Sequence, residues 1–276
     1  MASSEKRRLI VNADDFGLSA SVNTAVIRAH REGILTTASL MVNEAGFGEA
    51  VNLAKENPKL GVGLHLTLLQ GHSALPPEKI SGLVNSRGEF SGNSVGVGLG
   101  YFFKRNLHEQ LRTEIHAQFE KFQSTGLPLD HVNGHLHLHL HPMIFKILME
   151  DAEKLGIRQM RLTRDCFSRS RKISSGHLFY KISHATIFEF LSSRARKPLR
   201  QQGIKHAQIT FGLLQDSRVD EDYILKLLPE LPPGDSELYS HPSLGEFRHE
   251  FDALASPRVK EQIKKLGIEL IRYQDL

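Results

Sequence analysis

The sequence predicts an α/β fold in which short parallel strands alternate with helices. Strand-like apolar runs and stretches of amphipathic helical periodicity follow one another along the chain. The length of 276 residues suits one large α/β domain. Acidic and histidine side chains follow several of the apolar runs, as expected where strand ends form a site. Eight expected strands favour a barrel, although an open sheet fits the same alternation.

The expected strands are runs of aliphatic and β-branched residues at 8–13, 36–43, 61–68, 131–139, 157–162, 206–212, 235–241 and 268–273. The expected helices present one apolar face and lie at 20–32, 107–124, 143–155, 220–228 and 257–265. Ser19 is the expected N-cap of the first helix, and Ser256 with Pro257 begins the last. We expect a single domain over residues 1–276, with residues 1–7 flexible.

Two stretches interrupt this alternation. Residues 71–106 are rich in Gly, Ser and Pro and are expected to form a long loop near the site. Residues 164–205 form a basic insertion with ten Lys or Arg against two acids, and apolar side chains within it favour an amphipathic helix. Such a helix indicates peripheral contact with an anionic membrane. A barrel helix with a solvated basic face and a dimer contact are the alternative interpretations.

Two adjacent carboxylates, Asp14 and Asp15, follow the expected strand 8–13. Adjacent charges repel each other and are costly to desolvate, so packing alone does not favour the pair. One carboxylate is expected to ligate a metal ion while the other acts as a base. The alternative is an Asx-type turn that caps the following helix.

Five histidines occur within eleven residues, at His131, His135, His137, His139 and His141. If this segment is a strand, the last four share one face and the intervening leucines share the other. Buried imidazoles need a metal ion or a hydrogen-bond partner, so metal chemistry is the first hypothesis. A catalytic first-row metal site uses no more than three protein ligands. Most of the five histidines are therefore expected to support the ligands or contact a substrate.

Two further histidines belong to expected strands. His65 is in the run 61–68, and His241 precedes Pro242 near the C-terminus. In a barrel of parallel strands the active site gathers at the carboxyl ends of the strands. We therefore expect both histidines to lie beside the carboxylate pair and the histidine cluster.

Composition fits a cytoplasmic enzyme. The net charge of +4 is too small to favour nucleic acid as a partner. The single cysteine, Cys166, excludes an intramolecular disulfide and gives no thiolate metal site. No apolar stretch is as long as a membrane span, and residues 1–8 are not followed by a signal-type cleavage pattern.

Four motifs resemble, in order, those of the YdjC/ChbG-like carbohydrate deacetylases; they lie at 12–17, 63–65, 131–137 and 240–242. The resemblance extends from about Arg8 to the C-terminus. It implies an irregular (β/α) TIM-like barrel and a metal-dependent hydrolase that removes the acetyl group from an N-acetylated amino sugar. Residues 129–139 resemble most closely the hopanoid-biosynthesis-associated (HpnK-like) branch, which implies an N-acetylglucosaminyl lipid (hopanoid) conjugate as the substrate.

The resemblance also implies roles for individual residues. Asp15, His65 and His135 correspond to the metal ligands, Asp14 to the catalytic base, and His241 to a candidate acid. One divalent ion is implied, and it is Mg²⁺ by resemblance. The Asp/His/His ligand set by itself suits Zn²⁺, Mn²⁺ or Co²⁺ better.

Four residues are expected to bind substrate or to support the ligands: Asn133, His137, His139 and Arg161. Asn133 stands where the family usually has Asp, which leaves no carboxylate at that position to orient His135. In the expected reaction, Asp14 takes a proton from a metal-activated water and His241 gives one to the departing amine. His137 and His139 are second choices for the acid.

Other functions remain open. Soluble chitooligosaccharides are an alternative substrate class. A phosphoesterase needs a second carboxylate cluster, which is not evident, and a non-catalytic sugar- or lipid-binding barrel needs no base. The expected partners are an N-acetylated amino sugar, the inner membrane face through residues 164–205, and a second copy in a homodimer, with no nucleic acid.

Overall fold

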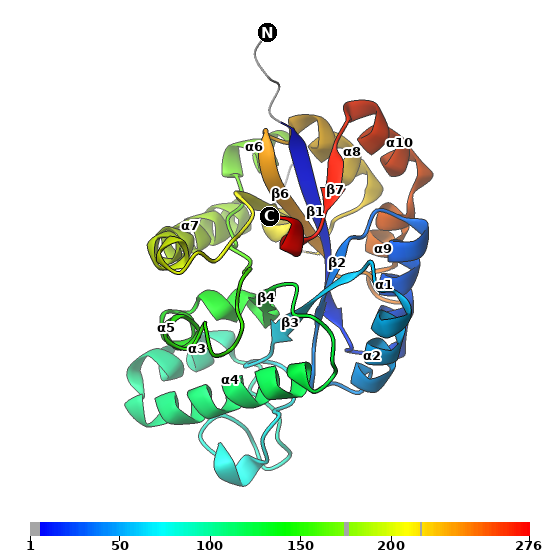
Figure 1. Ribbon diagram of the computed structural model, residues 1–276. Helices are drawn as coiled ribbons and strands as arrows, with labels where there is room; N and C mark the ends of the chain where they lie inside the picture. Colours follow the sequence, from blue (N-terminus) through cyan, green and yellow to red (C-terminus); the bar gives the residue numbers. More distant parts are fainter. Residues whose placement is uncertain (1–5, 174–176, 216) are drawn as a thin grey trace.

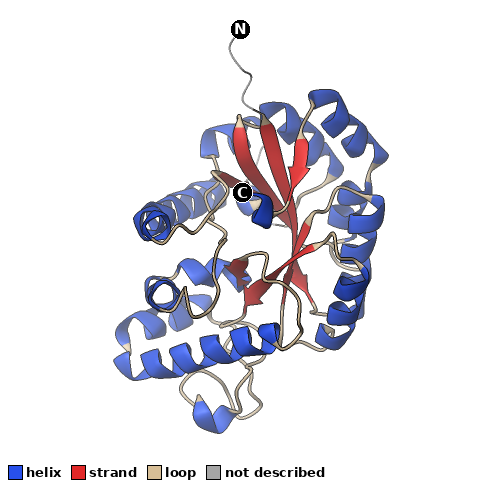
Figure 2. Ribbon diagram, viewed as in Figure 1, coloured by secondary structure: helices blue, strands red, loops and turns tan. Residues whose placement is uncertain are grey.

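The computed structural model describes residues 6–173, 177–215 and 217–276, and its strands form one parallel sheet flanked by helices (Figures 1 and 2). The strands are β1 Arg7–Phe16, β2 Thr37–Leu40, β3 Gly61–Leu66, β4 Val132–Gly134, β5 Ile209–Phe211, β6 Gly234–Ser240 and β7 Glu269–Ile271. Their order is β4-β3-β2-β1-β6-β5, with β7 paired to the first half of β1. β1 is central because its apolar residues are buried on both faces of the sheet.

The longer helices are α1 Ala20–Glu32, α2 Phe47–Glu56, α3 Ser94–Phe103, α4 His108–Gln123, α5 Pro142–Glu150, α6 Phe167–Ile173, α7 Leu178–Gln201, α8 Glu221–Glu230, α9 Arg248–Ala255 and α10 Pro257–Leu266. In Figure 1, α1, α2, α9 and α10 lie to the right of the sheet, whereas α3, α5 and α7 lie to the left. The Ser19 side chain caps α1 by accepting from the Val22 N–H, and Ser256 caps α10, as the sequence predicts.

The α/β class with a parallel sheet is confirmed, but the strands form a half-barrel rather than a closed barrel. The expected strand 157–162 makes only isolated bridges, between Gln159 and Lys205 and between Met160 and Val132. These bridges span the gap between β4 and the segment before β5. Because the successive residues Gln159 and Met160 bridge to different neighbours, no continuous ladder forms on either side.

The prediction of a strand at 131–139 is also wrong. β4 ends at Gly134, and His135–Leu140 form a 3₁₀ turn, η3. Leu136 and His137 have φ of 51° and 58°, in the left-handed region. This turn removes the two-residue alternation of a strand, so the histidines do not share one face.

The two irregular stretches contain helices. Residues 71–106 include α3 and a short 3₁₀ turn, Pro77–Lys79, so they are not a continuous loop. Residues 164–205 contain α6 and α7. The sequence prediction omitted α2 and α9, which are short. Of the segment expected to be flexible, residues 1–5 lie outside the described residues, and Arg7 already belongs to β1.

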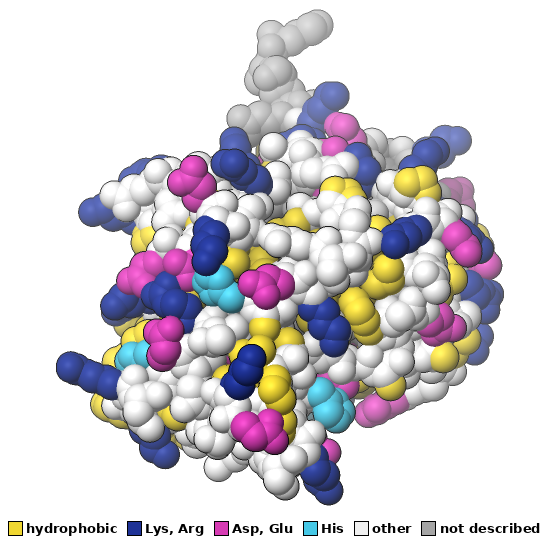
Figure 3. Space-filling view, turned by 60° about the horizontal axis from the view of Figure 1, so that its bottom comes forward, with side chains coloured by type: hydrophobic (Ala, Val, Ile, Leu, Met, Phe, Trp, Pro, Cys, Tyr) yellow, Lys and Arg dark blue, Asp and Glu magenta, His cyan; other side chains and the backbone are white. Residues whose placement is uncertain are grey.

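Within the described ranges, no helix combines the length and the apolar character needed to cross a membrane. Figure 3 shows apolar side chains reaching the surface between lysines, arginines and acidic residues on the face turned forward.

Candidate active site

The carboxylates of Asp14 and Asp15 border the same site because β1 ends in a bulge. Successive strand residues normally point to opposite faces. Asp15, however, has φ of 61°, and the pairing register between β1 and β2 shifts between Ala13 and Phe16. As a result, Asp14 Oδ1 lies 3.9 Å from His65 Nδ1 while Asp15 Oδ1 lies 3.2 Å from His65 Nε2.

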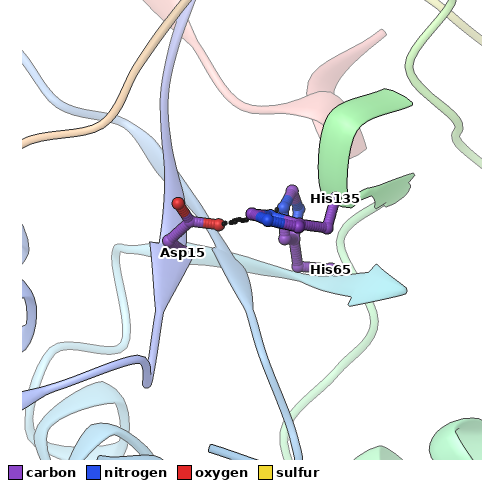
Figure 4. Close-up of side chains that lie close together, drawn as sticks. All are labelled: Asp15, His65 and His135. Atoms are coloured by element: carbon purple, nitrogen blue, oxygen red, sulfur yellow. Dashed lines mark hydrogen bonds and ion pairs between the residues drawn. The ribbon is translucent and has the colours of Figure 1, made fainter. Parts of the chain in front are cut away.

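Asp15, His65 and His135 form a candidate metal-binding triad, from the ends of β1 and β3 and the start of η3 (Figure 4). Asp15 Oδ1 is 3.2 Å from His65 Nε2 and 3.0 Å from His135 Nδ1. Ligands held at ~2.0–2.2 Å from one ion are about 3.0–3.4 Å apart, so the spacing suits a divalent ion.

The hydrogen bonds of His65 support the same interpretation. His65 Nδ1 donates to Asn133 Oδ1 at 2.7 Å, because the amide oxygen can only accept. In the neutral ring, Nε2 then presents a lone pair to the Asp15 carboxylate. Two facing acceptors are stabilised by a cation between them, which is the arrangement of a metal site. Asn133 therefore orients His65, whereas the sequence had only indicated that position 133 offers no carboxylate to orient His135.

The Asp14 carboxylate accepts hydrogen bonds from three side chains. Arg161 donates from Nη1 to Oδ2 at 2.6 Å and from Nη2 to Oδ1 at 3.0 Å. The amides of Asn12 and Asn133 also donate to Oδ1, at 2.8 and 3.0 Å. Burial by itself would raise the pKa of Asp14, but the charge of Arg161 holds this pKa well below its usual range. The carboxylate is therefore ionised.

Arg161 is itself fully buried between Asp14 and Glu237. Its Nε and Nη2 donate to Glu237 Oε1 at 2.9 and 2.7 Å, while the hydroxyls of Tyr273 and Thr210 donate to Oε2. Both carboxylate oxygens of Glu237 therefore accept hydrogen bonds from buried side chains.

Together, Asp14, Asp15 and Glu237 bring three acidic groups to this region, against the single guanidinium of Arg161. A divalent cation at the triad would neutralise this excess, which is otherwise costly to bury. The charge of the buried groups thus agrees with the donor set and with the spacing of the ligands.

A cavity of about 350 Å³ opens beside the triad. Strand ends and η3 supply one wall, with Asp14, His65, His135, His137, Tyr239 and His241. α7 supplies another wall with Tyr180, His184 and Phe188, which recur at intervals of four residues. The residues expected at the strand ends are therefore brought together, and the basic insertion contributes to the same cavity.

His241 lies in this cavity and also borders an adjoining one beside Asp14 and Asp15. Its Nδ1 is 3.9 Å from the Glu250 carboxylate, and its backbone N–H donates to the same group. His241 is thus placed between a buried carboxylate and the pocket.

His137 and His139 differ in position. His137 lines the cavity, and its Nε2 is 2.9 Å from the Tyr239 hydroxyl. His139 is fully buried, with Nε2 donating to the Arg161 carbonyl at 3.0 Å, so it supports Arg161 rather than a substrate. Burial and the nearby Arg161 charge lower the pKa of His137 and bring that of His139 to about 3. Both rings are neutral near pH 7, which disfavours them as acids.

Sequence reasoning did not single out several side chains of the site: Asn12, Ser39, Glu237, Tyr239 and Tyr273. One signal was available, since Asn12 is a polar residue inside the otherwise apolar run 9–13. A polar side chain at a buried strand position needs a partner across the sheet. The partner, however, lies far away in the sequence and cannot be identified from one strand alone.

Comparison with known proteins agrees with this geometry. A model of the YdjC-like protein family matches residues 8–265. The chitooligosaccharide deacetylase of Proteus mirabilis is 40% identical over 284 residues, covering 97% of this chain and 98% of the relative. A carbohydrate deacetylase of Brevibacillus brevis is 42% identical over 150 residues, covering 54% of this chain and 57% of the relative.

Among solved structures, a candidate cellobiose-phosphate cleavage protein of Enterococcus faecalis has the same fold. Its TM-score is 0.75 at 24% identity, covering 98% of each chain. The fold and the site together describe an α/β half-barrel protein with a candidate metal-binding triad of Asp, His and His at its strand ends. The family match is more specific, and the chain belongs to the YdjC-like family.

Proposed function

We propose that this protein is a metal-dependent hydrolase that removes the acetyl group from an N-acetylated amino sugar. The observation that carries the proposal is the triad of Asp15, His65 and His135 beside the ionised Asp14 in one cavity. Its family, together with a chitooligosaccharide deacetylase matched over nearly its full length, supports carbohydrate deacetylation as the activity.

Asp15, His65 and His135 would hold one divalent ion. When bound, it polarises the amide carbonyl and lowers the pKa of a water molecule from ~15.7 towards about 7. Mg²⁺ is the family expectation, whereas two imidazoles favour Zn²⁺, Mn²⁺ or Co²⁺. Asn133 would fix the ring of His65 so that Nε2 faces the ion.

Asp14 would act as the general base. As the water oxygen bonds to the acetamide carbonyl carbon, the Asp14 carboxylate accepts the proton that leaves the water. Arg161, Asn12 and Asn133 keep this carboxylate ionised and fixed in orientation. They also lower its basicity, so Asp14 depends on the acidity of the water that it deprotonates.

His241 would complete the reaction as the general acid. When the carbon–nitrogen bond breaks, the imidazolium gives a proton to the amine nitrogen, and acetate and the free amino sugar result. The Glu250 carboxylate lies 3.9 Å from the Nδ1 atom of this ring.

For the substrate we favour an N-acetylglucosaminyl lipid (hopanoid) conjugate. Residues 129–139 support this choice through their resemblance to the hopanoid-associated branch. The side chains of α7 that line the cavity, Tyr180 and Phe188 among them, offer apolar surface to an aglycone. A soluble chitooligosaccharide is the second candidate, because the relative from Proteus mirabilis is named for that substrate. A lipid substrate would place the enzyme at the inner membrane face of the cytoplasm.

Acetate release from two substrates tests the proposal. Metal-loaded protein is assayed with N,N′-diacetylchitobiose and with an N-acetylglucosaminyl lipid in detergent, before and after chelation. We expect turnover of both substrates, a higher kcat/KM for the lipid, and loss of activity without metal. Turnover of chitobiose alone would refute the lipid assignment and leave the deacetylase standing.

Metal content identifies the ligands independently of activity. His65→Ala and His135→Ala should each lose the bound ion in elemental analysis while retaining a cooperative thermal transition. His116→Ala is the matched control, because this histidine pairs with Asp151 away from the cavity. Full metal retention in both ligand variants would show that the triad does not bind the ion.

A further inference from the structure

The exposed large apolar side chains are concentrated beside the active-site cavity. Among the described residues, ten of the twelve such side chains lie on α3, η3 or α7. Monomeric soluble proteins rarely expose contiguous apolar patches beyond a few hundred Å² unless the patch has a binding role. The location of these side chains therefore indicates a partner that meets the protein at the mouth of the cavity.

α3 carries the first apolar face. Its four exposed residues follow at intervals of four, three and one position, which places them on one side of the helix: Val95, Leu99, Phe102 and Phe103. Their exposed fractions are 70%, 55%, 52% and 70%. The helix is tied to the rim of the cavity, since Ser94 lines it and His141 Nε2 donates to the Gly98 carbonyl at 3.0 Å.

α7 carries the second apolar face, formed by Leu178, Phe179, Ile182, Ile187 and Phe190. Phe179 is 88% exposed, the highest value among the exposed apolar side chains of the described chain. The neighbouring side of the same helix lines the cavity through Tyr180 and His184. Leu136 of η3, half exposed, also lines the cavity. The apolar faces of α3 and α7 thus border one opening.

Cations accompany both faces. Lys104 and Arg105 follow α3 directly and are exposed. Arg194 and Lys197 lie 15 and 18 positions after Phe179, so they continue the apolar face of α7 toward its C-terminus. α3 has no acidic residue, and the one acid of α7, Glu189, is held in ion pairs with two arginines.

We propose that the exposed faces of α3 and α7 form a docking surface for an anionic lipid bilayer around the mouth of the active-site cavity. Exposed aromatic and aliphatic side chains insert at the headgroup boundary, and neighbouring lysines and arginines attract anionic headgroups. Delivery of a membrane-embedded substrate through this surface rests on the proposed function. Binding of the bilayer to this surface does not depend on the proposed function.

A second copy of this chain fits the surface less well. A twofold contact through the same faces would bring Arg194 and Lys197 of each copy toward the like charges of the other, with no free acid on α7 to compensate them. Anionic headgroups complement these charges instead. The charge on the surface therefore favours lipid.

Vesicle binding tests the proposal on the full chain. Cosedimentation is measured with phosphatidylcholine vesicles that contain phosphatidylglycerol and with phosphatidylcholine vesicles alone. The triple variant Val95→Ser, Leu99→Ser, Phe103→Ser should bind the anionic vesicles at least about tenfold more weakly than the parent. Leu270→Ser, an exposed apolar residue on β7 away from the surface, is the matched control and should bind like the parent.

Chitobiose deacetylation without vesicles is followed in the same samples. Unchanged turnover with weakened vesicle binding supports the docking surface, and it separates that surface from the proposed catalysis. Absence of vesicle binding by the parent, or equal binding by the triple variant, overturns the proposal. So does a parent dimer in sedimentation velocity that the triple variant converts to a monomer, because the occupant would then be a second copy.

Discussion

At the scale of single residues, the backbone of Asp15 decides the chemistry of the candidate site. Its φ of 61° lets two successive carboxylates reach one site, where a regular strand would turn one of them away. Asp15 then faces His65 and His135, while Asp14 forms an ion pair with Arg161. The two carboxylates are therefore chemically different, one suited to bind a cation and the other to accept a proton.

This difference predicts the effect of Asp14→Asn. The amide keeps the volume and leaves the triad intact, so metal content should not change. Without the proton acceptor, kcat should fall by about 10²–10⁴. Asp252→Asn is the control, since Asp252 is exposed and pairs with Arg248 on the surface. If the Asp14 variant turns over substrate almost as fast as the parent, then Asp14 is not the base and only holds Arg161 in place.

At the scale of elements, the buried carboxylate of Asp165 connects α6 to the 3₁₀ turn that borders the cavity. Asp165 accepts from the Ser170 hydroxyl of α6 at 2.8 Å and from the backbone N–H of Leu214 at 3.2 Å. Leu214 belongs to the 3₁₀ turn Leu213–Gln215, whose first residue lines the cavity. Burial raises the pKa of Asp165 to about 6, although both hydrogen bonds lower it in part.

The raised pKa predicts a dependence of stability on pH. An acid with a higher pKa in the folded state than its ~3.9 in the unfolded chain favours folding most at low pH. This contribution is lost as pH rises from about 4 to about 6, and it amounts to about 3 kcal/mol. Urea unfolding at pH 4.5 and 7.5 should therefore show the parent losing stability relative to Asp165→Asn. An equal difference between the two proteins at both pH values would contradict the prediction.

At the scale of the whole molecule, the surface charge is distributed unevenly. The net charge is only +4, yet residues 164–205 carry ten Lys or Arg against two acids. Arg196 already pairs with Glu189 at 3.3 Å, whereas Arg194 lies over the Phe190 ring and Lys197 is exposed. Arg194 and Lys197 are thus exposed cations on α7, as Arg200 is, whereas the ion pair of Arg196 makes it less available to an anionic surface.

We therefore expect the double variant Arg194→Glu, Lys197→Glu to bind anionic vesicles more weakly than Arg196→Glu does. Each cation near a charged bilayer contributes about 1 kcal/mol, so the double variant should lose roughly tenfold or more in affinity. The parent's binding should also weaken with added salt, because ions screen charges beyond ~8–10 Å. Equal binding by the two variants would mean that charge on this face does not contribute.

The sequence by itself determined that several acidic and histidine side chains gather at the strand ends. Asp14, Asp15, His65 and His241 lie in or directly after expected strands, and the carboxyl ends of parallel strands meet whatever the loops between them do. Helix starts at Ser19 and Ser256 were equally predictable, because a cap depends on residues only two or three positions away.

Only the tertiary structure decided the remaining features. The turn of η3, the bulge at Asp15 and the open half-barrel depend on contacts between distant segments. Arg161 binds Asp14 across 147 positions, and Tyr273 binds Glu237 across 36. The exposed face of α3 was also hidden in an apparent loop, since its glycines mask the helical pattern. Local propensity carries no information on such partners, because their energy arises only when the sheet brings them together.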